Sequence, residues 1–314
     1  MAQVESARVG RRRGAALAAF SLLAVFATAA TPAIDVHAAS ASTLPSVVST
    51  NLCADLFALS LAAPAQLLSV SWKSQDPARS PRAEQARAYA ANRASAEEII
   101  HLHPDIVLAS RAWRRHPPAA RFEALGIRVV VVPLAKTWPE ILEVTQWVAD
   151  QIDRSARGRE VVAQTERRLA RLAVPAADGR PRSVLYLRPS GGSAGAGSFI
   201  DTLLRGAGLT NHATTLGLEG WGRVDLETLL VSPPDLFLLS AYTRDRGYAE
   251  SQLLRHPAMR SLFTGRRVLR LPTNQGSCST WHLIETAEYL ARQLLTTGAA
   301  KDGAAIGERS GAGR

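Results

Sequence analysis

Several tryptophan, arginine and lysine side chains follow short apolar segments that have the pattern of buried strands. Tryptophan can stack on the flat face of a ligand, and arginine can donate hydrogen bonds to amide or carboxylate groups at its edge. Ligands of parallel sheets bind beyond the carboxyl ends of the strands. The candidate ligand-binding residues are therefore Trp72, Lys73, Trp113, Arg188, Trp221, Arg223, Tyr242, Arg244 and Trp281.

The two cysteines, Cys53 and Cys278, each follow a predicted strand, one in each half of the chain. Three interpretations stay open at this point. The cysteines form a disulfide between the halves, or they are separate thiols at the ligand site, or they are buried structural residues. The sequence alone does not give the separation of the two Cα atoms that a disulfide requires.

The histidines do not have the spacing of a metal site. His101 and His103 are two positions apart, which places them on different faces of a helix. His282, next to Trp281, is a weak candidate for a single metal ligand. Because a bare transition-metal ion needs several histidine, cysteine or carboxylate ligands, we expect no resident metal, no cofactor and no catalytic residue.

Alternating strands and helices must position these residues. Apolar, β-branched runs predict strands at residues 47–49, 67–72, 106–108 and 127–132 in the first half, and at 184–187, 235–239 and 268–271 in the second. Helical patterns cover residues 55–61, 199–206 and 280–295. Continuous apolar strands that alternate with helices predict an α/β fold with parallel sheets.

Two helices separate the halves. Thr137 and Glu140 have the spacing of a capping box, which predicts the start of one helix. A second helix is predicted at about residues 154–173, and twenty helical residues span about 30 Å. A helix of this length can connect two lobes rigidly.

Residues 95–110 are repeated as residues 225–240. Ser95 and Asp225 are predicted N-caps. In each copy a proline ends the helix, and a Pro-Asp pair precedes a strand. Glu97 and Glu227 occupy matching positions in the first turns, where a carboxylate favours the helix dipole. The repeat therefore predicts two halves with similar folds.

The N-terminus has the order of a secretory signal peptide. Arg11, Arg12 and Arg13 precede an apolar segment that ends at Ala30, and small residues follow. We expect residues 1–41 to be a cleaved signal peptide with a short leader, and the mature protein to be periplasmic. A membrane anchor is the alternative, although the apolar segment is slightly short for a span. The cleavage position and the choice between general and twin-arginine export stay open.

The composition is that of a globular protein, with 46% hydrophobic residues. The 37 Lys and Arg residues outnumber the 27 Asp and Glu residues. Because the arginines are scattered and no stripe of arginines with interleaved aromatics appears, we expect no nucleic-acid binding. Residues 299–314 are rich in Gly and Ala, and we expect them to be a disordered tail.

The chain resembles the class III periplasmic substrate-binding proteins of ABC importers. The resemblance rests on the repeated unit that contains Glu97 and Glu227, the turn at residues 206–211 (GAGLTN) and the long central helix. Members of this class bind cobalamin, haem or iron–siderophores. The segment Asn51-Leu52-Cys53-Ala54-Asp55 looks most like the cobalamin-binding members. The resemblance covers residues 47 to 295.

The resemblance implies two lobes, each a mostly parallel sheet flanked by helices, joined by a long rigid α-helix. We place the lobes at residues 43–136 and 181–298, and the helical segment at 137–174. The ligand held between the lobes would be a small-molecule metal chelate, in the first instance cobalamin or another corrinoid, and alternatively an iron–siderophore or haem. Haem ligation by Tyr186, Tyr242 or His282 stays open.

The resemblance also implies a partner. Glu97 and Glu227 would dock onto an ABC permease dimer that carries a cytoplasmic ATPase. We expect a monomer that performs no chemistry. An enzyme subunit of the chelatase or reductase type on the same two-lobed scaffold is the alternative from another functional class.

Overall fold

The computed structural model describes residues 44–115, 119–172, 182–188, 191–240, 256–264 and 266–294. The predicted signal peptide, the C-terminal tail, Tyr242 and Arg244 lie outside these residues. Within the described ranges, the structure has no helix with the length and hydropathy needed to span a membrane.

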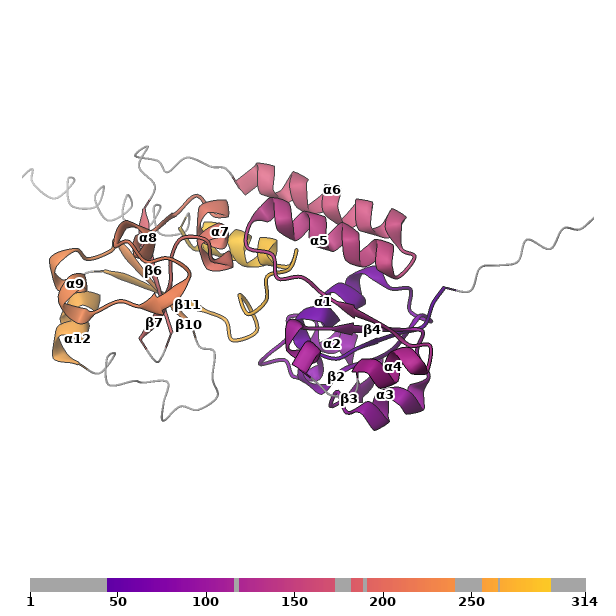
Figure 1. The fold of residues 1–314 in the computed structure, drawn as a ribbon. Coiled ribbons are helices and arrows are strands. Elements are labelled where there is room, and N and C mark those ends of the chain that lie inside the picture. Colours follow the sequence, from indigo (N-terminus) through magenta and orange to yellow (C-terminus); the bar gives the residue numbers. More distant parts are fainter. Residues whose placement is uncertain are drawn as a thin grey trace, which may run out of the picture. The chain divides into compact units, whose positions relative to one another are not determined.

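The first sheet has five parallel strands in the order β3-β2-β1-β4-β5 (Figure 1). The strands are β1 (Val47–Ser49), β2 (Leu67–Ser71), β3 (Ala90–Asn92), β4 (Ile106–Ala109) and β5 (Arg128–Val131). The chain first adds strands on one side of β1 and then returns to add β4 on the other side. Ligands of such sheets bind beyond the carboxyl ends of the strands at this reversal, here β1 and β4.

Helices cover both faces of this sheet. They are α1 (Leu52–Leu61), η1 (Trp72–Gln75), α2 (Ala83–Ala86), α3 (Ala96–Leu102), η2 (Arg111–Arg115) and α4 (Ala119–Ala124). Successive strand residues point to opposite faces, so Val47 packs with Phe57 of α1, whereas Val48 packs with Ile99 of α3. We call this sheet with its helices the first lobe.

The second sheet has four parallel strands in the order β11-β10-β6-β8. The strands are β6 (Ser183–Leu187), β8 (Thr210–Asn211), β10 (Leu236–Ser240) and β11 (Arg267–Leu271). Its helices are α7 (Phe199–Gly206), α8 (His212–Thr215), α9 (Leu226–Val231), α12 (Pro257–Phe263) and a helix at residues 283–294. Tyr186 packs on one face with Leu283, and Leu187 on the other with Met259. We call this sheet with its helices the second lobe.

A two-stranded antiparallel ribbon belongs to the second lobe. It pairs β7 (Gly192–Ala194) with β9 (Trp221–Arg223). Just after β7, a Cβ atom on Gly195 would lie 1.8 Å from the carbonyl oxygen of Leu218. Glycine is therefore required there, because any side chain would collide with the backbone that pairs with it.

Two further helices, α5 (Trp138–Gln151) and α6 (Ser155–Leu172), lie side by side (Figure 1). They approach closely at Gly158, where a Cβ atom would lie 2.6 Å from Cβ of Ala149. The 18 residues of α6 span about 27 Å. The predicted capping box at the start of α5 forms only in half. Thr137 accepts from the Glu140 N–H at 3.3 Å, but the Glu140 carboxylate accepts from Lys136 N–H at 2.7 Å.

The repeat has the same structure in both lobes, since α3–β4 in the first corresponds to α9–β10 in the second. The N-cap positions agree with the prediction, although only the first has side-chain capping. Ser95 forms a full capping box with Glu98, whereas the side chain of Asp225 makes no capping hydrogen bond. The predicted α/β fold with two parallel sheets is confirmed, while the residue boundaries of the lobes stay predictions.

Candidate functional site

Trp72 stands at the carboxyl end of β2 as the first residue of η1, and its side chain is 39% exposed. Two guanidinium groups lie over its ring, that of Arg79 at 5.5 Å and that of Arg93 at 5.8 Å from the ring centroid. These distances suit cation–π attraction. The neighbouring Lys73 is exposed. The first lobe therefore presents an aromatic face surrounded by positive charge.

A buried carboxylate fixes the backbone beside Trp72. Asp55 of α1 is fully buried and accepts a hydrogen bond from the Ser71 hydroxyl at 2.5 Å and from the Ser74 hydroxyl at 2.6 Å. The Ser71 N–H also points at the carboxylate, 3.2 Å from each oxygen. Burial raises the pKa of Asp55 to about 6, although hydrogen bonds from serines oppose the shift.

The second lobe presents a similar face at Trp221, the first residue of β9, which is 46% exposed. The Arg188 guanidinium lies 4.7 Å from its ring centroid. Tyr186 and Phe199 contact the same ring from the side, at centroid distances of 6.2 and 5.7 Å. Arg223 ends β9 and is exposed. Both lobes thus combine an exposed tryptophan with arginine at a strand end or on the following loop.

Trp281 differs from these two because it is partly buried and packs against the main core clusters of both lobes. The Arg82 guanidinium lies 5.9 Å from its ring centroid. Three residues earlier, Cys278 forms a disulfide with Cys53 at the start of α1, with the two Cα atoms 5.4 Å apart. Of the three interpretations of the cysteines, the structure has the disulfide, which joins the first lobe to the segment after β11.

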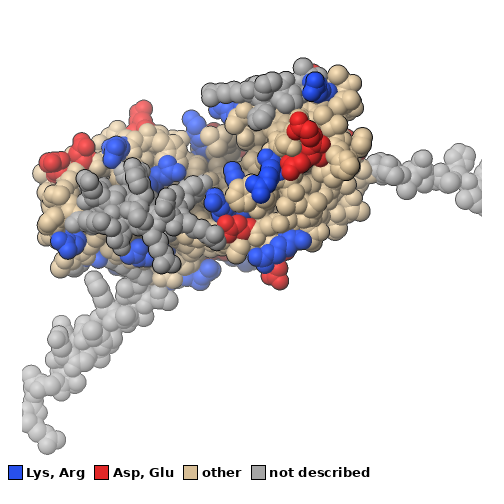
Figure 2. All heavy atoms as spheres, turned by 90° about the horizontal axis from the view of Figure 1, so that it is seen from below, with Lys and Arg blue, Asp and Glu red and all other residues tan. Residues whose placement is uncertain are grey.

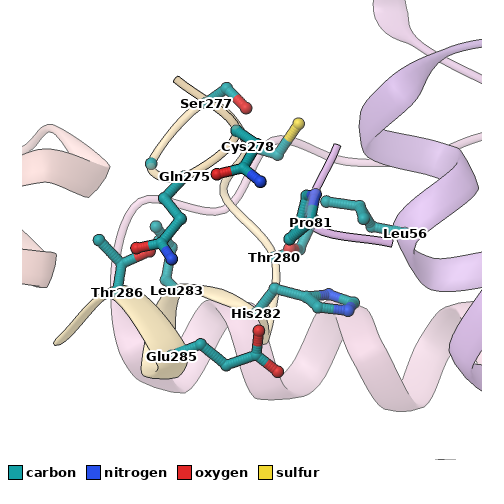
Figure 3. A pocket seen from close by; sticks show the side chains of 12 residues that line it. Leu56, Pro81, Gln275, Ser277, Cys278, Thr280, His282, Leu283, Glu285 and Thr286 are labelled. Carbon is teal, nitrogen blue, oxygen red and sulfur yellow. The ribbon is translucent and has the colours of Figure 1, made fainter. Parts of the chain in front are cut away.

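A small cavity of about 20 Å³ lies beside this disulfide (Figure 3). Leu56 and Pro81 of the first lobe line it together with Gln275, Thr280 and His282. Neither ring nitrogen of His282 has a hydrogen-bond partner among the described residues. Burial, with a smaller contribution from Arg82 and Arg168, holds the pKa of His282 well below its usual range. The imidazole is therefore neutral.

A metal ion bound by the protein alone would need a cluster of ligating side chains. The described residues contain no group of three or more histidine, cysteine or carboxylate side chains placed to bind one. The weak candidate His282 stacks on Trp281 at a centroid distance of 3.8 Å.

Trp113 does not share the exposure of Trp72 and Trp221, and its expected place at the ligand site stays a prediction. It belongs to η2, is only 5% exposed, and stacks on Phe122 at a centroid distance of 5.7 Å. The turn of η2 directs the ring back into the core of its own lobe, where it joins Val107 and Ala109.

Glu97 and Glu227 lie in the first turns of α3 and α9, and both side chains are exposed. Leu230 and Val231 follow Glu227 on α9 and are 49% and 87% exposed. On the face drawn in Figure 2, basic and acidic side chains are scattered over the surface. The two glutamates are thus free of the cores and stand at equivalent places in the two lobes.

Sequence reasoning did not place Asp55, Arg79 or Arg93 at this site. Arg93 follows β3, and the strand-end rule would have found it had β3 been predicted. The Ala90-Ala91-Asn92 segment has no β-branched residue, so it carried no strand signal. Asp55 has no local signal, because its partners in β2 and η1 come from a later part of the chain.

Comparison with known proteins agrees with this geometry. The family model for periplasmic binding proteins matches residues 47–267, well over half of the chain. The chain belongs to the periplasmic binding protein family. Its fold is that of class III members, as the sequence predicted, and members of this family are substrate-binding proteins that work outside the cytoplasm. No curated protein matched the chain.

Solved structures share the fold of this periplasmic binding protein. The periplasmic haem-binding protein HutB of Vibrio cholerae is 18% identical, with a TM-score of 0.65 over 80% of this chain and 98% of that one. The periplasmic vitamin B12-binding protein BtuF of the same organism is 20% identical, with a TM-score of 0.59 over 81% and 97%. A possible iron-binding protein of Staphylococcus epidermidis is 15% identical, with a TM-score of 0.63 over 79% and 98%.

Proposed function

We propose that this periplasmic binding protein captures a metal chelate, with a corrinoid as the first candidate, and delivers it to an ABC importer. The observation that carries the proposal is the pair of exposed tryptophans, Trp72 and Trp221, each with arginine over its ring. Trp72 directly follows the carboxyl end of β2, and Trp221 begins β9. A flat macrocycle can stack on such faces, and each stacked aromatic contributes about 0.5–1.5 kcal/mol beyond area burial. Lys73, Arg188 and Arg223 would contact its side groups.

One observation favours a second candidate, haem or an anionic ferric siderophore. The guanidinium groups of Arg79, Arg93 and Arg188 surround the two tryptophans. Arginine pairs more strongly with carboxylates than with the neutral amides of a corrinoid, because the hydrogen bonds are charge-assisted. Solved structures with this fold include a haem-binding and a vitamin B12-binding protein, so both candidates lie within the range of this fold.

A titration decides between these candidates. The mature protein is titrated by calorimetry with cyanocobalamin, haemin and a panel of ferric siderophores. Saturable binding of one of them in the nanomolar to micromolar range identifies the chelate class. No binding to any member of the panel would contradict the proposal. Turnover of a bound tetrapyrrole would favour the chelatase or reductase alternative instead.

Variants test which side chains form the site. Trp72→Ala and Trp221→Ala are each expected to weaken binding more than tenfold, since each removes one stacking face. Trp147→Ala is the matched control, because Trp147 is 37% exposed but lies on α5, away from the strand ends. A tryptophan whose loss changes affinity no more than Trp147→Ala is not part of the site.

Delivery would use Glu97 and Glu227, one on each lobe, which could meet arginines of a permease dimer through charge-assisted contacts. The double variant Glu97→Lys/Glu227→Lys is expected to abolish uptake of the chelate by cells and to leave its affinity in solution unchanged. The double variant Glu123→Lys/Glu143→Lys, at exposed positions on α4 and α5, is the control because it makes the same change of net charge. Normal uptake by the double variant would reject the docking role.

A further inference from the structure

We propose that Asp55 is a positioning residue that holds Trp72 ready for the chelate by fixing the backbone on both sides of it. The inference rests on the proposed function, since it assigns Trp72 a contact with the ligand. Asp55 itself is fully buried and touches no ligand. Its effect on binding would pass through the segment from Ser71 to Ser74.

The hydrogen bonds of Asp55 enclose Trp72 in the sequence. Ser71, the last residue of β2, directs both its N–H and its hydroxyl to the carboxylate, and Ser74 of η1 donates its hydroxyl. Both serines are buried, at 3% and 0% exposure. Because the Trp72 ring is 39% exposed, packing restrains it only in part. The fixed backbone on either side must supply the rest of its orientation.

A buried carboxylate is an unfavourable side chain for a purely structural role at this position. Burying it costs free energy unless several hydrogen bonds compensate. One carboxylate oxygen, Oδ2, accepts from both hydroxyls, and the Ser71 N–H lies 3.2 Å from each of the two oxygens. An asparagine would keep one acceptor oxygen but would turn an NH2 donor towards the Ser71 N–H. Replacement by an apolar residue would leave the donors buried and unpaired. The geometry therefore explains why a carboxylate, and not an amide or an apolar group, bonds the serines on either side of Trp72.

Asp55 also lies close in the sequence to the disulfide that holds the segment carrying Trp281. It lies in the first turn of α1, two residues after Cys53, whose disulfide partner Cys278 precedes Trp281 by three residues. The start of α1 is thus a common anchor for the Trp72 turn and for the segment that carries Trp281. A chelate that contacts both tryptophans would meet a preorganised pair and lose less conformational entropy on binding.

The first experiment measures how rigidly the backbone of the turn is held in the absence of a ligand. Amide hydrogen exchange of residues 71–75 is followed in the mature protein and in Ser74→Ala, Asp55→Ala and Asp55→Asn. Ser69→Ala is the matched control, because Ser69 is buried in the same strand but bonds Ala90 and Asn92 rather than Asp55. We expect at least tenfold faster exchange in Ser74→Ala and Asp55→Ala, and partial rescue in Asp55→Asn.

The second experiment measures affinity for cyanocobalamin and haemin in the same variants and in Trp72→Ala/Ser74→Ala. Ser74→Ala is expected to weaken binding about fivefold in the native background and to have no effect once Trp72 is absent. An unchanged affinity in Ser74→Ala, with Trp72→Ala still weakened, overturns the positioning role and leaves the proposed function intact.

The two claims fail in different ways. If neither probe binds the native protein, the proposed function fails for these chelates, and exchange alone then decides whether Asp55 fixes the turn. Exchange of residues 71–75 that matches the Ser69→Ala control would overturn the positioning role. Ser74→Ala keeps the test decisive should Asp55→Ala not fold, because it removes a single hydroxyl.

Discussion

Arg168 of α6 and Glu288 of the helix at residues 283–294 form a two-pronged ion pair. Nε of Arg168 lies 2.7 Å from one carboxylate oxygen of Glu288, and Nη2 lies 2.7 Å from the other. The pair raises the pKa of Arg168 and lowers that of Glu288. It joins the long connecting helix to the last helix of the second lobe.

Lysine cannot replace Arg168 in this pair, because an ammonium group offers no planar fork to the carboxylate. Arg168→Lys is expected to destabilise the protein by about 1 kcal/mol, a modest value because both side chains are partly exposed. Urea unfolding monitored by circular dichroism measures the change. Arg157→Lys is the control, since the Arg157–Glu160 pair is more exposed. If the two substitutions lower the free energy of unfolding equally, the Arg168–Glu288 pair is no stronger than the exposed Arg157–Glu160 pair.

The disulfide between Cys53 and Cys278 constrains a long stretch of chain, since 225 residues separate the two cysteines. Cys53→Ser/Cys278→Ser is expected to lower the free energy of unfolding by roughly 2–5 kcal/mol, because the unfolded chain regains its freedom. Urea unfolding of the double variant, beside native protein kept with and without a reductant, measures this. Reduced native protein should behave like the double variant. A double variant as stable as the oxidised native protein would contradict the prediction.

Asp55 should make the fold more stable as the pH falls. Its pKa is about 6 in the folded protein and 3.8 in the unfolded chain, so the folded state binds the proton more tightly. The contribution is complete below pH 4 and is lost as the pH rises through 6. Between pH 7.5 and pH 5 the native protein should gain about 1 kcal/mol relative to Asp55→Asn. Parallel pH dependence of the two proteins in urea unfolding would refute this.

His282 should have the opposite effect on stability, making the fold less stable as the pH falls. Burial lowers its pKa well below 6.5 in the folded protein, so the unfolded chain takes up a proton that the folded protein does not. Its contribution is present above pH 6.5 and is lost at about 1.4 kcal/mol for each pH unit below that. His282→Phe keeps a ring against Trp281 and removes the titration. Thermal unfolding should show the variant gaining on the native protein from pH 7 to pH 5, and a constant difference would count against a neutral buried imidazole.

Gly195 should not tolerate a side chain. A Cβ atom there would collide with the backbone of Leu218, which accepts a hydrogen bond from the Ala196 N–H. Gly195→Ala is expected to destabilise the second lobe by more than about 2 kcal/mol, since backbone must move. Gly126→Ala is the contrast, because that position has a positive φ but open space around it. The melting temperatures of the two variants are compared. An equal fall in melting temperature would show that the backbone moves away from the new Cβ atom at little cost in free energy.

Much of the fold could be predicted from local patterns. The apolar runs at residues 47–49 and 184–187 form central strands, and Ser95 forms a helix-capping box with Glu98, as their local patterns predict. The repeat extends further than the sequence suggested. Ser46 and Asp105 exchange hydrogen bonds, and Ser183 and Asp235 do the same in the second lobe. The strand runs and the Ser95 cap depend on neighbouring residues, which a linear pattern encodes. The two Ser–Asp pairs join residues 59 and 52 positions apart, and no local pattern predicted them.

What the sequence determined by itself was therefore the alternation of strands and helices, the doubled unit and the class of protein. Only the tertiary structure decided that Cys53 is bonded to Cys278, that Trp113 turns into the core while Trp72 stays exposed, and that Asp55 bonds the serines on either side of Trp72. Each of these outcomes depends on side chains brought together from separate elements. The free energy of such contacts arises from burial and geometry after the chain has packed, and no spacing along the sequence records it.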